Sequence, residues 1–233
     1  MNWFKTNKRP SIKLIGGIGG KIIGVGVMGC IFSTMVNLPL ELRVIKQPVS
    51  NPECLIWTLS LLLPITLIGG GWWQYQKRVG WPKWTRQTSL TVIGGIFSMG
   101  VIEIGLMTLN NLLTREATTP NNAALMVFKQ AGVRSLFYAT VVVMAPMMEE
   151  LVYRGGCQHL LAKQLRTTNH GNAWALVLSS LVFGLMHQGG TPIGKLTYVL
   201  MGVVLGMVYQ HTHDLRACTL VHLVNNGLAA LSM

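Results

Sequence analysis

The feature that most constrains this chain is the recurrence of apolar stretches close to the length that crosses a bilayer. A transmembrane helix needs about 20 mostly apolar residues, because a helix rises about 1.5 Å per residue across a core about 30 Å thick. Only 11% of the 233 residues are charged, against about 25% in soluble domains. Lipid also requires backbone groups to pair within each segment, which favours helices. The stretches are 14–38, 54–73, 88–109, 134–152, 172–190, 193–210 and 214–232.

These stretches predict an all-α protein, a polytopic membrane helical bundle with about seven transmembrane helices. The chain carries a formal net charge of +12. Its basic residues lie mostly in short segments between apolar runs, as in the cytoplasmic loops of membrane proteins. That placement argues for a lipid bilayer as partner and against nucleic acid. We therefore predict an integral, multi-pass cell-membrane protein.

The N-terminus is predicted to lie in the cytoplasm, because several basic residues precede an apolar run too long for a typical signal peptide. A second basic segment, 74–87, contains several tryptophans and reads as a cytoplasmic loop. The segment 110–133 is polar with few charges, which indicates an outside loop with a short surface helix.

Two of the few carboxylates are adjacent and follow an apolar run directly. An ionisable group inside a membrane costs at least about 2.5 kcal/mol on insertion scales, so a specific role is expected. Arg154 lies one helical turn after Glu150 and can pair with it, whereas Glu149 points about 100° away and can face a cavity. The alternative is that both glutamates only neutralise basic residues at a helix end. The carboxylates are Glu41, Glu53, Glu103, Glu116, Glu149, Glu150 and Asp214.

Two histidines in later apolar runs are the other candidates. His187 follows Phe183 by one turn, and His222 precedes Asn226 by one turn. An imidazole and an amide on one helix face can donate to a developing oxyanion. Each can equally be structural, through snorkelling at an interface or an interhelical hydrogen bond. If the fourth helix continues through Arg166, Glu149 falls near its middle, and if the fifth extends past Gln188, His187 moves inward as well. We therefore predict a long, partly polar fourth helix whose second half faces protein or a water-filled cavity.

Three motifs occur in order on successive apolar segments: Glu-Glu-x-x-x-Arg at 149–154, Phe-x-x-x-His at 183–187 and His-x-x-x-Asn at 222–226. Together they resemble the CPBP family, also called Abi, which contains type II CAAX prenyl proteases and bacteriocin-immunity proteins. The resemblance covers residues 134–233, which we predict to form a catalytic helical core. Residues 1–133 match only as hydrophobic helices, and we predict them to form N-terminal transmembrane helices with a basic cytoplasmic loop.

The resemblance implies an intramembrane endopeptidase that cleaves a small peptide precursor or the tail of a membrane-associated protein, in bacteriocin or signal-peptide maturation or in self-immunity. By that resemblance, Glu149 and His187 would activate a water, while His222 and Asn226 would stabilise the oxyanion or assist binding. The supporting residues would be Glu150, Arg154 and Phe183. No cofactor is certain. Zinc is a minor option, held by Glu149, His187 and His222, although no HExxH sequence occurs.

Two other functions compete with this one. The same fold could serve a non-catalytic bacteriocin-immunity or scaffold protein, because fold does not fix function. A small transporter with a glutamate proton relay is a third hypothesis, but we see no internal repeat of the kind that transporters show. Glu103 is expected to pair with Lys21 or Arg134 in a packing role, and Asp214 to lie in a solvated His-Thr-His-Asp turn. The oligomeric state and the substrate stay open.

Overall fold

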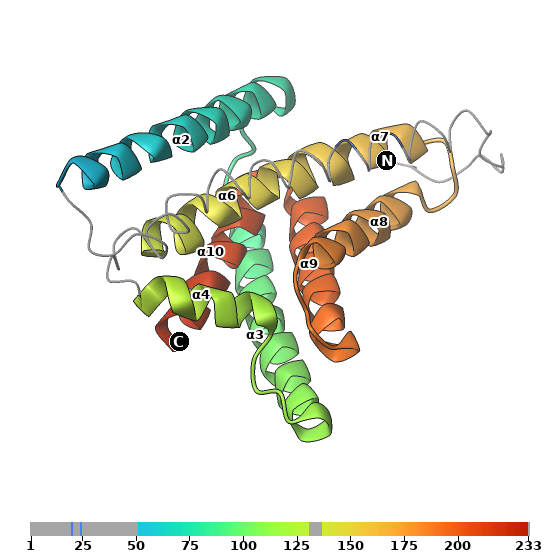
Figure 1. The fold of residues 1–233 in the computed structure, drawn as a ribbon. Coiled ribbons are helices and arrows are strands. Elements are labelled where there is room, and N and C mark those ends of the chain that lie inside the picture. Colours follow the sequence, from blue (N-terminus) through green and yellow to red (C-terminus); the bar gives the residue numbers. More distant parts are fainter. Residues whose placement is uncertain (1–19, 21–23, 25–50, 131–136, 233) are drawn as a thin grey trace.

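The computed structural model describes residues 20, 24, 51–130 and 137–232, and every regular element in these ranges is a helix (Figure 1). This confirms the all-α fold class. The predicted first helix, 14–38, lies outside the described residues except for Gly20 and Gly24. The helices are α2 (Asn51–Val79), α3 (Arg86–Thr114), α4 (Pro120–Gln130), η1 (Tyr138–Met144), α6 (Ala145–Glu150), η2 (Leu151–Gln158), α7 (His159–Leu165), α8 (Gly171–Met186), α9 (Pro192–Thr212) and α10 (Leu215–Ser232).

Two of these helices, α3 and α9, are long and apolar enough to cross a membrane by length and composition. The expected short surface helix in 110–133 corresponds to α4. The fifth apolar stretch corresponds to α8, which ends at Met186 and does not extend past Gln188. A glycine pair follows, and Gly190 has a φ of +75°, a left-handed conformation that glycine adopts without strain.

The predicted long fourth helix is confirmed, since η1, α6, η2 and α7 join end to end without a break. We call Tyr138–Leu165 the composite helix. It passes between α2 on one side and α3, α9 and α10 on the other (Figure 1). Its segments η1 and η2 are π-helical, and they flank α6, which carries both glutamates. Single π turns inside α-helices are rare and occur frequently at functional sites.

The first π segment, η1, has a backbone carbonyl that is hydrogen-bonded by a side chain of α10. The N–H of Ala145, which would reach Val141 in a regular α-helix, instead donates to the carbonyl of Thr140. The next π-type donor to the Val141 carbonyl would come from position 146, but Pro146 has no N–H. Asn226 on α10 fills this place, because its Nδ2 donates to the Val141 carbonyl over 3.0 Å. The amide therefore satisfies a carbonyl that the proline leaves without a backbone partner.

Close helix packing brings the second π segment against α9. Arg154 Nη2 donates to the carbonyl of Gly202 over 2.9 Å, and Gln158 Nε2 donates to that of Gly206 over 3.0 Å. A Cβ at Gly202 would lie 3.0 Å from the Cα of Ser180 on α8, so glycine also lets α8 approach. Small residues spaced four apart allow such approach between membrane helices.

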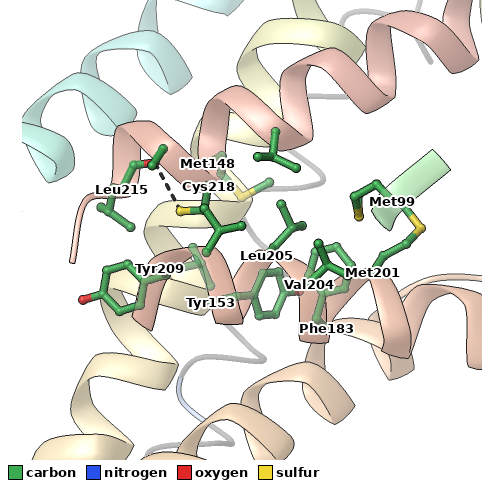
Figure 2. Close-up of a cluster of buried hydrophobic side chains, with 14 of the residues drawn as sticks. Met99, Met148, Tyr153, Phe183, Met201, Val204, Leu205, Tyr209, Leu215 and Cys218 are labelled. Carbon is green, nitrogen blue, oxygen red and sulfur yellow. Dashed lines mark hydrogen bonds between the residues drawn. The ribbon is translucent and has the colours of Figure 1, made fainter. Parts of the chain in front are cut away.

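A hydrophobic cluster with residues from most of the described helices lies next to the site. Figure 2 shows aromatic, methionine and aliphatic side chains from the composite helix, α8, α9 and α10 meeting in it. Met99 brings α3 into the same cluster. Phe183 and Leu205 are fully buried there. The core thus holds the helices that carry the candidate residues in fixed relative positions.

Candidate active site

The structure brings Glu149, His187 and His222 together from three separate helical segments. Glu149 Oε2 lies 3.7 Å from Nε2 of His187 and 3.8 Å from Nε2 of His222. Glu149 and His187 keep 17% and 16% of their side-chain surface exposed, against 3% for His222. Glu149 Oε2 itself is buried and has no hydrogen-bond partner among the described residues. The three groups therefore face a shared space rather than bonding directly to each other.

Each imidazole is held through its other ring nitrogen. His222 Nδ1 lies 2.8 Å from Glu150 Oε1, and His187 Nδ1 lies 2.8 Å from the carbonyl of Phe183. Carbonyl and carboxylate oxygens accept, so both Nδ1 atoms donate, and Nε2 of each ring faces Glu149.

Three polar atoms thus converge at separations too long for a direct hydrogen bond. A water between them can bridge them by hydrogen bonds.

The predicted pairing of Glu150 with Arg154 is confirmed. Their side chains are 0% and 1% exposed, and Arg154 Nε lies 3.2 Å from Glu150 Oε2. The guanidinium also lies over the ring of Phe183, 4.7 Å from its centroid. A buried carboxylate needs such compensation because of its desolvation cost. Glu150 is therefore anchored between Arg154 and His222, while Glu149 stays available to the cavity.

His187 reaches the site from the end of a helix, not from within one. It is the C-cap residue of α8, with an extended backbone (φ −94°, ψ 144°). Its ring stacks on Tyr198 of α9 with centroids 4.6 Å apart, and it lies against the tilted ring of Phe183 with centroids 4.5 Å apart. Sequence reasoning missed Tyr198, since its contact depends on how α9 folds back onto α8. The only local signal is the cap at Thr191, whose side chain accepts from the N–H of Gly194 and starts α9.

The three groups line a cavity of about 330 Å³ with mixed polar and apolar walls. Helix α4 closes one side of it and the composite helix with α10 another. Asn226 also lines the cavity, although one of its amide hydrogens is engaged by Val141. The polar lining residues are Glu103, Thr119, Asn121, Asn122, Glu149, Tyr153, His187, Thr197, Tyr198, His222, Asn225 and Asn226.

A glutamate with two histidines is also a donor set that zinc accepts. Within the described ranges, however, no group of three or more His, Cys, Asp or Glu residues is arranged to hold a metal ion.

Two further acidic residues, Glu103 and Asp214, make contacts that the sequence analysis did not predict. Glu103 lines the cavity, and its side chain hydrogen-bonds Asn225 of α10. Its two expected partners lie outside the described residues. The expectation for Asp214 was wrong: it is 2% exposed and bonds Arg216, with Nη2 2.6 Å from Oδ2. The turn before α10 buries this acid because Asp214 Oδ1 accepts the N–H of Arg216 at the start of the helix.

The described helices thus hold a glutamate and two imidazoles around one cavity. Residues 132–228 match a family described as type II CAAX prenyl endopeptidase Rce1-like. This match confirms the resemblance to the CPBP family, a family of membrane-embedded proteases, for the carboxy-terminal part of the chain. Neither a search of curated proteins nor a search of solved structures found a match.

Proposed function

We propose that this chain is an intramembrane endopeptidase that uses Glu149 to activate a water against a peptide carbonyl. The observation that carries the proposal is the position of Glu149 Oε2 between two Nε2 atoms, at 3.7 and 3.8 Å, in a cavity. A general base must lie within hydrogen-bond reach of the proton it removes, directly or through one water. The space between these three atoms offers a water that reach.

The reaction would proceed by addition and elimination. Glu149 takes a proton from the water, and the oxygen forms a bond to the carbonyl carbon, which creates a tetrahedral oxyanion. The carbon–nitrogen bond then breaks, and Glu149 returns its proton to the leaving nitrogen. The products are a carboxylic acid and an amine, which become a carboxylate and an ammonium when the acid's proton passes to the amine. His187 holds the water in line through Nε2, and its ring is fixed by Tyr198 and Phe183.

The oxyanion needs hydrogen-bond donors, and His222 is the best placed. Its Nδ1–H bonds Glu150, which is kept ionised by Arg154. A carboxylate in this position stabilises the imidazolium form, in which Nε2–H becomes a donor toward the cavity. Asn226 has a second amide hydrogen beyond the one given to Val141, so it can assist. Donors of this kind typically contribute about 10²–10³ in kcat.

The substrate would be a short segment of a peptide precursor or of a membrane protein's tail. A cavity of about 330 Å³ suits a few residues rather than a folded domain. The alternative role, a non-catalytic immunity or scaffold protein, makes no demand on the water-binding geometry of Glu149.

Cleavage by purified protein in lipid nanodiscs tests the proposal. A library of internally quenched peptides identifies a cleaved sequence, and Glu149→Gln and His187→Ala are compared with the wild type. Glu149→Gln keeps size and polarity but removes the base, so cleavage should fall by at least about 10². Glu116→Gln is the matched control, because Glu116 is exposed and does not line the cavity. Equal cleavage by wild type and Glu149→Gln would refute the proposal.

A further inference from the structure

Glu103 is a second carboxylate in the proposed active-site cavity, and it comes from a helix outside the matched family region. It lies on α3, whereas the family match begins at residue 132. It lines the cavity together with Glu149. Its side chain is oriented by a hydrogen bond with Asn225, which is 7% exposed and lies on α10 three residues after His222. The helix that carries one candidate catalytic group thus also holds Glu103 in place.

The two cavity carboxylates act on the same part of the wall. Tyr198, the residue stacked on His187, lines the same cavity as Glu103 and Glu149. His222 lines this cavity as well. A group bound beside the water at Glu149 would therefore have Glu103 as a neighbour.

The charges around this space do not balance among the described residues. The described lining contains both carboxylates but no lysine or arginine. Arg154 forms an ion pair with Glu150, and neither residue lines the cavity. Lys195 donates to the backbone carbonyl of His187 and also lies outside the lining. No ion pair between described residues includes Glu103.

An acid within a membrane helix is costly to bury, and a cation that arrives with a ligand offsets that cost. We propose that Glu103 is a specificity-determining residue that binds a lysine or arginine side chain of the substrate, close to the bond that is cut. This inference rests on the proposed peptidase function and names the class of substrate, a peptide with a basic residue near the cleavage site. A carboxylate and an ammonium or guanidinium form a charge-assisted hydrogen bond, which is roughly twice as strong as a neutral one. The bilayer surroundings strengthen the pair further by excluding water.

The test compares peptides that differ only in the presence of the cation. Quenched peptides carry lysine, arginine, norleucine or glutamate at each position flanking the cut bond, and kcat/KM is measured in nanodiscs. Wild type should prefer lysine over norleucine by at least about tenfold at one position, as expected for one charge-assisted bond. Glu103→Gln should abolish this preference by lowering kcat/KM for the lysine peptide more than for the norleucine peptide. Glu103→Asp, which keeps the charge, should retain part of the preference.

Two controls separate this inference from the function beneath it. Glu116→Gln removes an equal charge from outside the cavity and should keep the lysine preference. Glu149→Gln should fail on the norleucine peptide as well. If Glu103→Gln keeps the lysine preference, or lowers both peptides equally, the assignment of Glu103 is wrong while the peptidase stands. If Glu149→Gln cleaves normally, or no peptide is cut by the wild type, the peptidase itself fails and the inference fails with it.

Discussion

The hydrogen bond from Asn226 to the Val141 carbonyl allows the contribution of Asn226 to stability to be measured separately from its contribution to cleavage. Val141 is 6% exposed, and the amide donates to it over 3.0 Å. An interhelical hydrogen bond in a membrane protein contributes about 0.6 kcal/mol on average, and an unpaired buried carbonyl costs about 1–3 kcal/mol. We therefore expect Asn226→Ala to lower the free energy of unfolding by about 1–2 kcal/mol.

Pro146→Ala should remove most of that cost. Alanine at position 146 supplies the missing N–H for a π-type bond to Val141, and relaxation to a regular α-helix would pair the same carbonyl through Ala145. The two substitutions should then show a coupling energy of about 1 kcal/mol in a double-mutant cycle. The assay is equilibrium unfolding in mixed micelles, followed by proteolytic sensitivity of the wild type, both single variants and the double variant.

Cleavage measured on the same four proteins reports the chemical role. If Asn226 also assists the oxyanion, the double variant regains stability but not activity. If Asn226 only pairs the Val141 carbonyl in the composite helix, the double variant regains stability and activity together. Additive stabilities, with no coupling between positions 146 and 226, would refute the account of the Val141 carbonyl.

Two further predictions follow from close contacts. Gly184→Ala places a Cβ 2.3 Å from Cγ2 of Val199, so it should lower the unfolding free energy by about 1–3 kcal/mol; Gly100→Ala, with nothing within 4 Å, should be neutral or mildly stabilising in the same unfolding assay. Tyr198→Phe keeps the ring that stacks on His187 and should retain most peptide cleavage, whereas Tyr198→Ala should lose at least about tenfold in kcat. Similar kcat values for both tyrosine variants would show that stacking does not position the imidazole.

Much of the site could be predicted because its residues follow local rules. The four-residue spacing of Glu150 and Arg154 identifies a pair on one helix face, and the structure contains that pair. Glu149, the residue before Glu150, then points about 100° away around the helix. The long fourth helix followed from the need to bring these acids to the depth of the histidines, and the composite helix has that length. The domain division and the residue roles stay predictions.

The parts that could not be predicted depend on tertiary contacts. No residue pattern distinguishes a π turn from an α turn, and Pro146 signals only a missing donor. His187 reaches Glu149 from a helix cap, because α8 ends early and α9 folds back along it. The placement of Glu103 beside Asn225 requires the packing of α3 against α10, which sequence spacing does not encode.

The π turn in η1 also limits how the apolar segment before the glutamates can vary in length. Phe137 and Val141 pack with Ala230 near the end of α10, while Glu150 bonds His222 near its middle. Loss of one residue between these attachment points could be absorbed only if η1 relaxed to a regular α-helix, because a π turn holds one residue more than an α turn. An inserted residue would set the halves of the composite helix about 100° out of register, and one attachment would break. The number of residues in this apolar segment is therefore constrained more tightly than the identity of its side chains.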